Sequence, residues 1–182
     1  MRRILLLQLA ALGVLASLVA TPAPASAAPN EITTWTSASF DQPNGLVESA
    51  NGLLWSADFG GGVLRFNPTT GGFKRWDRAE GAQPRSGPIV GPDGLLWFGS
   101  DAGLVSFDPT DASFGGVAAA NVQAAAGLFV GPDGAIWFAS QGTDRIGRYV
   151  PGGAVTTYPS ANVDQPNDLT LGGDGAIWSP RC

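Results

Sequence analysis

One six-residue phrase occurs four times along this chain at nearly even spacing, and this repetition limits the folds that the chain can adopt. Each copy joins a turn containing Gly to two apolar residues and a tryptophan, and Trp55, Trp97, Trp137 and Trp178 are 42, 40 and 41 residues apart. A fixed period of about 40 residues is typical of repeat architectures, in which one supersecondary unit is stacked several times. The four copies of the phrase are residues 50–55, 92–97, 132–137 and 173–178.

The third copy, residues 125–164, shows the plan of the unit. Its short apolar runs are separated by turns rich in Gly, Pro and Asp, and no window shows a helical period over a useful length. The Asp133-Gly134 pair in the first turn supplies the positive φ that a two-residue hairpin needs. Short strands with turns about every 8–12 residues predict an antiparallel all-β unit. The expected strands of this copy are 127–130, 135–140, 145–150 and 154–158.

The rest of the sequence follows the same plan. The third strand is expected again at 63–66 and 104–107, and the fourth at 72–76 and 113–117. Residues 113–117 are rich in Gly and Ala, so this strand is weakly specified, and the last copy contains only its first two strands. The repeats, with their connections, are about 43–84, 85–124, 125–164 and 165–182.

Four antiparallel strands in a unit of about 41 residues match one blade of a β-propeller. The second strand is apolar at consecutive positions, as at 135–138, which is expected where neighbouring blades cover both faces of a sheet. The repeated Trp is expected to fill the gap between blades. We therefore predict an all-β fold, a β-propeller over residues 43–182 that is incomplete at about three and a half four-stranded blades.

The number of blades has a consequence for the assembly. Closed rings contain about four to eight blades, so three and a half blades are too few. We expect either a fragment of a longer propeller or a chain that associates with itself through exposed blade edges.

The N-terminus predicts export. Arg2 and Arg3 precede an apolar run at 4–20, and Ala25-Ser26-Ala27 fits a cleavage site for signal peptidase. We predict a signal peptide over 1–27 and a secreted, extracellular or periplasmic protein; the alternative, a membrane anchor, needs a longer run of about 20 residues. Residues 28–42 form an N-terminal segment, in which 31–35 resembles an outer strand without its own blade.

Charge and composition exclude several partners and sites. Cleavage after residue 27 removes Arg2 and Arg3 but no acid, so the net charge changes from −5 to −7. An acidic chain without a basic patch predicts no nucleic-acid partner and no membrane binding after cleavage. The single Cys, Cys182, cannot form an internal disulfide, and the absence of His and of further Cys argues against a transition-metal site.

The repeat resembles the streptogramin B lyase (virginiamycin B lyase) family. The resemblance rests on Gly-Pro-Asp-Gly-Ala-Ile-Trp-Phe at 131–138, Arg-Ile-Gly-Arg-Tyr at 145–149 and Val-Thr-Thr-Tyr-Pro at 155–159, with a second copy of the first motif at 91–98. It implies a propeller of seven blades. It also implies a lyase that opens a cyclic depsipeptide antibiotic by elimination, with magnesium, a catalytic His and acidic residues located in later blades.

The chain departs from this family at two repeated places. Where the family often has Pro-His-Gly at the start of the first strand, this chain has other residues, as at 43–45 and 166–168. Where the family often has Thr-Glu after the second strand, the acidic place holds Asp58, Ser100 and Ser140. No catalytic residue can therefore be assigned, and we expect the chain by itself to be inactive.

A more distant resemblance suggests a metal site. Gln42-Pro43-Asn44-Gly45 and Gln165-Pro166-Asn167-Asp168 are similar to motifs of gluconolactonase/regucalcin-like propellers, where Asn binds a calcium-type metal. The resemblance implies binding residues facing the channel, and Mg²⁺ or Ca²⁺ as the ion, since hard cations take carboxylate and amide oxygens. The alternative is that Asn and Asp beside Gly or Pro are ordinary turn residues. The candidate binding residues are Asn44, Asp58, Asn167 and Asp168.

Three functions therefore stay open. The first is an exported streptogramin-lyase-like propeller, inactive as this chain stands, with a small-molecule ligand in its channel. The second is a metal-dependent gluconolactonase-like hydrolase. The third is a non-enzymatic propeller that binds an extracellular ligand or protein.

Overall fold

The computed structural model describes residues 34, 36–38, 40–159 and 161–180. The predicted signal peptide 1–27, most of the predicted outer strand 31–35 and Cys182 lie outside the described residues, so these stay predictions. The described residues contain no helix that is both long and apolar enough to cross a membrane.

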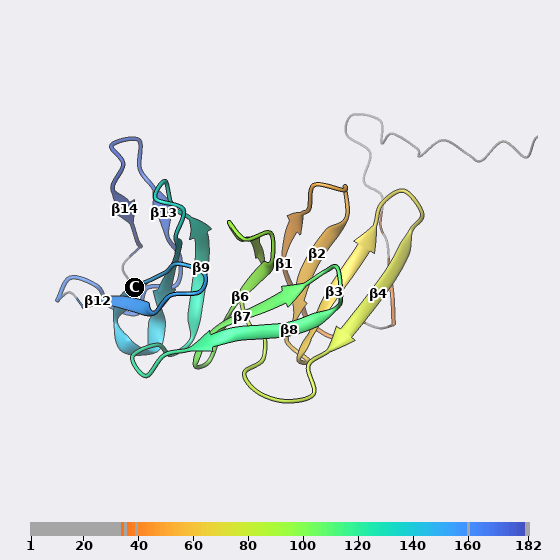
Figure 1. Cartoon of the computed structure of the whole chain (residues 1–182), viewed down its shortest axis with the longest axis horizontal. Helices are drawn as coiled ribbons and strands as arrows, with labels where there is room; N and C mark the ends of the chain where they lie inside the picture. The colour runs from red at the N-terminus through yellow and green to blue at the C-terminus, as the bar shows by residue number, and fades with distance from the viewer. Residues whose placement is uncertain (1–33, 35, 39, 160, 181–182) are drawn as a thin grey trace, which may run out of the picture.

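The described residues form three four-stranded antiparallel sheets and one two-stranded sheet, with a single short 3₁₀ turn (Figure 1). Within each sheet the strands keep their chain order, so each strand pairs with the one before it. The first sheet contains β1 (Pro43–Glu48), β2 (Leu54–Asp58), β3 (Gly62–Asn67) and β4 (Gly72–Asp77). The second contains β5 (Ile89–Val90), β6 (Leu96–Ser100), β7 (Gly103–Asp108) and β8 (Ser113–Ala118). The third contains β9 (Ala125–Val130), β10 (Ile136–Ser140), β11 (Arg145–Tyr149) and β12 (Val155–Pro159), with η1 (Gln141–Thr143) between β10 and β11, and the last contains β13 (Thr170–Leu171) and β14 (Ile177–Trp178).

These sheets confirm the predicted all-β blades almost strand for strand. The predicted strands of the third copy differ from β9 to β12 by at most two residues at either end. The weakly specified strand at 113–117 forms in full as β8, because its backbone pairs with β7 along its whole length. The last copy contains the expected first two strands, although each is only two residues long.

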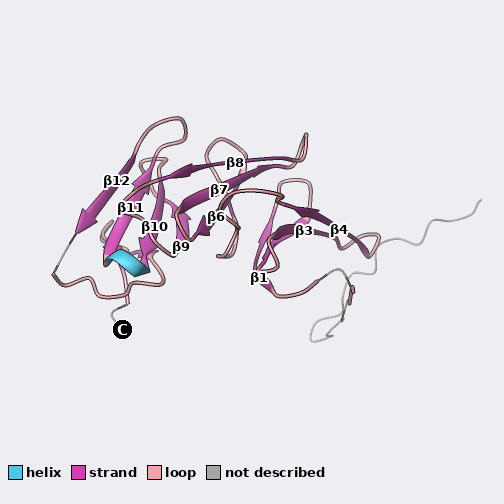
Figure 2. Ribbon diagram, turned by 90° about the horizontal axis from the view of Figure 1, so that it is seen from below, coloured by secondary structure: helices cyan, strands magenta, loops and turns pink. Residues whose placement is uncertain are grey.

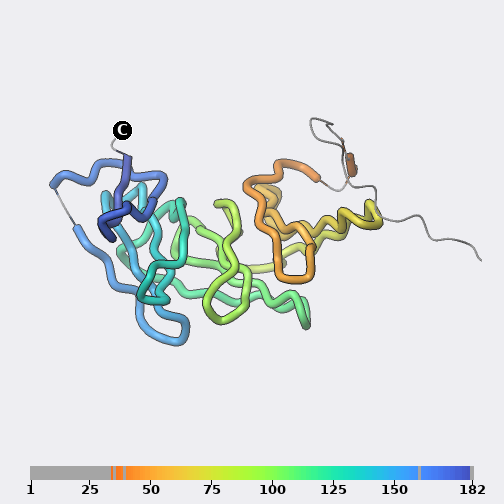
Figure 3. Tube along the Cα trace, turned by 90° about the horizontal axis from the view of Figure 1, so that it is seen from above, coloured from red at the N-terminus to blue at the C-terminus, as the bar shows by residue number. Residues whose placement is uncertain are grey.

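The sheets follow one another in an arc, as blades of a propeller do. In Figures 2 and 3 they run in chain order from the first sheet at one end to the last at the other. Among the described residues, no strand of the first sheet pairs with the last, so these sheets form an open sector and not a closed ring.

Aromatic side chains fill the gaps between blades. Trp55 contacts Phe107 of the second sheet with ring centroids 5.8 Å apart, and Trp97 contacts Tyr149 of the third sheet at 5.2 Å. The predicted role of the repeated Trp is confirmed at these two positions. Trp137 instead stacks on Tyr158 of its own sheet at 5.7 Å, and Trp178 is 58% exposed. All five residues of β6 are buried. The core of this sector therefore lies between adjacent blades.

The turn residue before each Trp does more than shape the hairpin. Gly134 has the predicted positive φ of 71°, and Asp133 accepts the N–H of Ala135 at 3.2 Å. The same carboxylate also accepts the indole N–H of Trp137 at 3.1 Å. Two other copies repeat this Asp–Trp bond, from Trp97 to Asp93 at 3.0 Å and from Trp178 to Asp174 at 3.4 Å. The recurring Asp therefore fixes the orientation of the recurring Trp, a contact that turn chemistry alone does not predict.

In the third sheet this Asp also binds an arginine. Arg148 donates from Nε to Asp133 at 2.7 Å, within its own blade, and its guanidinium lies 5.8 Å from the Trp137 ring centroid. The Trp137 indole, opposed by burial and assisted by Arg148 and the Ala135 N–H, lowers the pKa of Asp133 to about 2. Asp133 thus stays ionised at any ordinary pH.

The first sheet has an arginine at the position equivalent to Arg148, but it has no acid at the position equivalent to Asp133. Arg65 pairs across the strands with Trp55, as Arg148 does with Trp137. Asn51 occupies the place of Asp133, and its Oδ1 accepts the Ser49 hydroxyl at 2.7 Å and the Leu53 N–H at 3.3 Å. Arg65 Nε is buried and has no hydrogen-bond partner among the described residues. A buried donor without a partner is unfavourable.

Replacing Asn51 with Asp is therefore expected to stabilise the first blade. The new carboxylate keeps the acceptor used by Ser49 and Leu53 and offers its second oxygen to Arg65 Nε. We expect the free energy of unfolding to rise by about 0.5–1 kcal/mol, measured by urea denaturation. Asn67→Asp is the matched control, because Asn67 accepts the N–H of Thr69 in a turn at 2.9 Å but has no facing arginine. If the two substitutions changed the free energy of unfolding equally, the new carboxylate at position 51 would not be bonding to Arg65.

Candidate functional site

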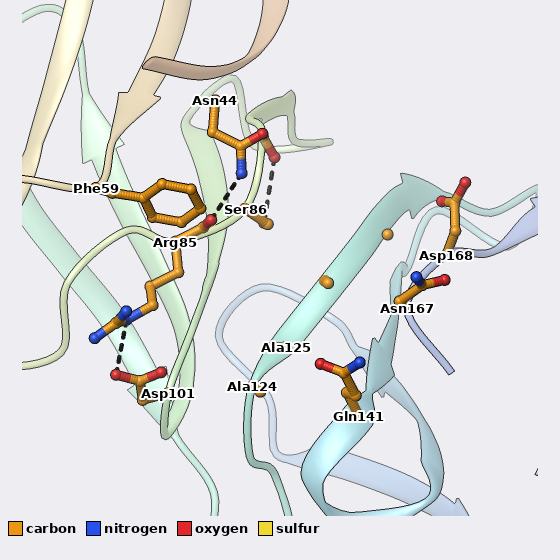
Figure 4. A pocket seen from close by; sticks show the side chains of 13 residues that line it. Asn44, Phe59, Arg85, Ser86, Asp101, Ala124, Ala125, Gln141, Asn167 and Asp168 are labelled. Carbon is orange, nitrogen blue, oxygen red and sulfur yellow. Dashed lines mark hydrogen bonds and ion pairs between the residues drawn. The ribbon is translucent and has the colours of Figure 1, made fainter. Parts of the chain in front are cut away.

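A cavity of about 380 Å³ opens where the inner ends of the blades converge. The starts of β1 and β9 contribute to it, together with the segments before β5 and β13 and the loops after β2, β6 and β10 (Figure 4). Segments from all four sheets thus meet at the centre of the arc. Its lining residues include Asn44, Phe59, Arg85, Asp101, Gln141, Asn167 and Asp168.

The wall formed by the first two blades is tied together by polar contacts. Asn44 donates from Nδ2 to the carbonyl oxygen of Arg85 at 2.9 Å, which joins β1 to the second blade. Arg85 Nε donates to Asp101 at 2.8 Å, and both side chains are about half exposed, at 52% and 58%. Phe59, which is 43% exposed, also borders this wall (Figure 4). The charge of Arg85 is therefore balanced within the wall, and an aromatic ring stands beside it.

The opposite wall comes from the last blade. Asn167 and Asp168 are exposed and lie on the opposite side of the cavity from Asn44 (Figure 4). Asp168 accepts the N–H of Leu169 at 2.9 Å through Oδ1. Of the four candidate residues from the sequence, Asn44, Asn167 and Asp168 thus line one cavity, although they occupy opposite walls.

Glycines set the spacing of these walls. The pairing of β1 with β2 shifts register between Asn44 and Val47, and Gly45 within this shift has a φ of 67°. The pairing of β9 with β10 shifts in the same way around Gly127, whose φ is 56°. A Cβ at Gly127 would lie 2.4 Å from the Cα of Asp168, so only glycine allows this approach between blades. The bulges therefore bring the last blade against β9 at the cavity.

Asp58, the fourth candidate, lies elsewhere. Its side chain is fully buried, forms an ion pair with Arg75 and accepts the N–H groups of Gln42 at 3.0 Å and Gly60 at 3.1 Å. Burial raises its pKa, but these backbone donors, the N–H of Asp41 and the Arg75 charge outweigh burial and lower the pKa below its usual value. The carboxylate anchors the chain that leads into β1, and it does not reach the cavity.

The same position is buried and makes structural hydrogen bonds in the next two blades. Asp58, Ser100 and Ser140 each stand three residues after the repeated Trp, and each is fully buried. Ser140 Oγ accepts the N–H of Gln123 at 2.9 Å, which anchors the chain before β9 as Asp58 anchors the chain before β1. Ser100 Oγ donates to the carbonyl of Gly103 at 2.9 Å. These side chains hold loops by hydrogen bonds, which either a carboxylate or a hydroxyl can make.

The cavity instead uses the next position of the repeat. Phe59, Asp101 and Gln141 each follow the repeated Trp by four residues, and all three line the cavity. Sequence reasoning did not select them, because each occurs in a loop with no motif of its own. Their constant distance from the repeated Trp is the signal that could have identified them, once the copies are aligned on that Trp.

The cavity does not fit the Mg²⁺ or Ca²⁺ that the resemblances imply. Among the described residues, no group of three or more His, Cys, Asp or Glu is placed to hold a metal ion. Asp101 is engaged by Arg85, which leaves Asp168 as the carboxylate available in this cavity. Ca²⁺ takes about six to eight oxygen ligands, and Mg²⁺ requires near-ideal octahedral geometry. We therefore derive no metal-dependent step from these residues.

Comparison with solved structures agrees with this arrangement of blades. No protein-family model and no curated protein matches the sequence. A catalytically inactive histidine-to-alanine variant of virginiamycin B lyase from Staphylococcus aureus, with Quinupristin, has 25% identity and a TM-score of 0.67 over 76% of this chain. A structure of streptogramin B lyase has 21% identity and a TM-score of 0.65 over 77% of this chain. The chain is a streptogramin B lyase-like β-propeller.

The likeness covers only part of the known lyase structures, and proteins of other classes share the same fold. This lyase-like propeller spans about half of each of those structures, 48% of the first and 54% of the second. A candidate gluconolactonase shares the fold at 20% identity, with a TM-score of 0.57 over 75% of this chain and 56% of its own. Extracellular domains of two-component systems from Bacteroides thetaiotaomicron share it as well, one at 17% identity and a TM-score of 0.63 over 81% of this chain and 22% of its own.

Proposed function

We propose that this lyase-like propeller is an exported binding protein that holds part of a cyclic depsipeptide, of the streptogramin type, in its central cavity. We further propose that its 182 residues do not open that ligand by themselves. The observation that carries the proposal is a cavity of about 380 Å³ whose one arginine, Arg85, is already paired.

The lining supports a ligand that is rich in amide groups and carries no negative charge. Asn44, Gln141 and Asn167 offer amide donors and acceptors, which are suited to the peptide and ester groups of such a molecule. Phe59 and the alanines of β9 supply apolar surface beside them. Small-molecule sites usually combine a mainly apolar cavity with a few placed polar groups, at volumes of about 300–1,000 Å³. A ligand larger than the cavity would extend out of its open side.

The absence of turnover follows from the chemistry that elimination requires. A side chain must remove a proton from the substrate, and His most often has this role in enzymes. In the Staphylococcus aureus relative, the inactive variant lacks one histidine, and this chain contains no histidine at all. Binding without ring opening is therefore the expected behaviour of this chain.

Export is the second part of the proposal. It is supported by the Arg2-Arg3 start, the apolar run and the small residues before position 28. Three solved structures that share the fold, of two Bacteroides thetaiotaomicron proteins, are extracellular domains. Processing is tested by expressing the full gene and sequencing the N-terminus of the protein recovered outside the cytoplasm, and an uncleaved intracellular product would contradict export.

Titration of the chain with Quinupristin in a calorimeter tests the binding. We expect saturable binding, and Asn167→Ala should weaken it about fivefold, the equivalent of one hydrogen bond of about 1 kcal/mol. Asn121→Ala is the matched control, because Asn121 is equally exposed but lies outside this cavity. Mass spectrometry of the recovered ligand should show the intact ring. Either a linear product, or binding that Asn167→Ala and Phe59→Ala leave unchanged, would overturn the proposal.

A further inference from the structure

A second cavity, of about 540 Å³, adjoins the central one on the same face of the blades. We call it the glutamine cavity, because Gln123, Gln141 and Gln165 line it together with Asp101 and Asp144. The two cavities share Asp101, Ala124 and Gln141, so they adjoin along these three residues.

The three glutamines come from separate parts of the chain. Gln123 precedes β9, Gln141 begins the short turn after β10, and Gln165 belongs to the connection before β13. Within the described residues, the side-chain amides of these three glutamines form no hydrogen bond. By contrast, Gln83 Nε2 donates to the carbonyls of Arg78 at 3.4 Å and Gly81 at 3.3 Å. Three amide groups therefore converge on the cavity with their donors and acceptors unused.

The backbone that carries these groups is held in unusual conformations. Ala124, Asp144 and Gln165 have φ angles of 52°, 52° and 41°, although none is a glycine. Only one other described residue besides glycine has a positive φ, Ala112. Such conformations are unfavourable and concentrate where the surrounding structure maintains them for a purpose.

Hydrogen bonds across the cavity floor maintain these conformations. The Gln165 N–H donates to Asp144 Oδ1 at 2.9 Å, and the Gly142 N–H donates to the carbonyl of Gln123 at 3.0 Å. The Gln141 N–H donates to the carbonyl of Ala124 at 3.3 Å. These bonds join the segments before β9, after β10 and before β13, so the three glutamines are presented on a preorganised frame, which reduces the entropy lost on binding.

The lining selects the chemistry of the ligand. A primary amide can donate to a carbonyl and accept from an N–H, and these are the two groups of a peptide unit. The lining contains no Lys or Arg for an anion, and no aromatic ring on which a sugar could stack. Asp144 also disfavours a ligand with a negative charge, whereas the charge of Asp101 is balanced by Arg85.

We propose that the glutamine cavity binds a segment of uncharged peptide backbone, which adjoins the part of the ligand held in the central cavity. The choice of a peptide rests on the proposed function, since both cavities then hold one amide-rich molecule. The placement of the three glutamines is independent of it.

The test is a titration of the ¹⁵N-labelled chain with acetyl-Gly-Gly-Gly-methylamide, followed by NMR. We expect the side-chain NH₂ signals of Gln123, Gln141 and Gln165 to shift, while the signal of exposed Gln42, outside both cavities, stays in place. Gln123→Ala and Gln165→Ala should each weaken the capped peptide about fivefold, and Gln42→Ala should not.

The controls separate this inference from the proposed function. If the capped peptide leaves the three glutamine signals unmoved, or if N-acetylglucosamine shifts them as strongly, the inference is overturned, whatever Quinupristin does. If Quinupristin does not bind but the capped peptide still moves the three signals and the variants weaken it, the proposed function fails and the peptide site stands.

Discussion

Replacing Asp58 with Ala is expected to lower the free energy of unfolding by about 3–5 kcal/mol, as removal of one partner from a buried ion pair does. The change leaves Arg75 without its buried partner and deprives the N–H groups of Gln42 and Gly60 of their acceptor. The loss is measured by urea denaturation followed by tryptophan fluorescence, since Trp55 and Trp76 stack in the same blade with centroids 5.6 Å apart.

Asp77→Ala is the matched control for this substitution. Asp77 also accepts from Arg75, at 2.5 Å, but its side chain is 71% exposed. An exposed pair contributes at most about 1 kcal/mol, so Asp77→Ala should be far milder than Asp58→Ala. Similar losses for the two variants would show that Asp58 has no special structural role.

The stability that Asp58 provides should also depend on pH. Its pKa in the folded protein lies below the ordinary value of 3.8, so the folded state binds a proton less readily than the unfolded chain. The contribution is therefore fully present above the unfolded pKa and is lost as the pH falls through the folded pKa. The difference in stability between the native chain and Asp58→Asn should shrink across this acidic range.

The effect should extend to the central cavity, although Asp58 does not line it. Phe59 follows Asp58 directly, and its N–H donates to the carbonyl of Gln42 at 3.1 Å. Asn44 stands two residues after Gln42 and ties β1 to Arg85. Loosening the Asp58 anchor therefore moves both Phe59 and Asn44, so Quinupristin affinity should fall together with stability.

Asp58 also shows that a residue can be placed correctly in a repeat while its contacts stay hidden from the sequence. Sequence comparison among the copies identifies the third position after Trp, which is occupied by Asp58, Ser100 and Ser140. The burial of this position depends on contacts far along the chain, such as the one from Asp58 to Arg75 in β4. The local sequence gives no sign of that partner. The next position, four residues after Trp, lines the cavity, but it could not be recognised because its residue type differs in every copy.

The strands, by contrast, could be predicted because their signals are local. The Gly131–Gly134 turn needs a positive φ at one place, and Gly134 provides it. Pro151-Gly152-Gly153 separates β11 from β12 in the same way. The Asp133–Arg148 bond could not be predicted in this way, because the two residues are 15 positions apart in the sequence and become neighbours only when β10 and β11 pair.

Gly127 is the position where fold and site depend on each other most directly. Its φ of 56° and the 2.4 Å that a Cβ would leave to the Asp168 Cα make Gly127→Ala both strained and overpacked. The left-handed conformation costs about 1 kcal/mol, and overpacking adds typically 1–3 kcal/mol. We expect the free energy of unfolding to fall by about 2–4 kcal/mol, measured by urea denaturation.

Gly134→Ala separates the two contributions. Gly134 has a φ of 71°, and a Cβ there meets nothing within 4 Å, so this variant shows the conformational cost alone, at about 1 kcal/mol. The excess loss in Gly127→Ala then measures the clash with the last blade. Because that clash pushes Asp168 and Asn167 away from β9, Quinupristin affinity should fall in Gly127→Ala and stay unchanged in Gly134→Ala. Equal stability losses with unchanged affinity would mean that the last blade is not held against β9, and the opposite wall of the central cavity would then have to be reassigned.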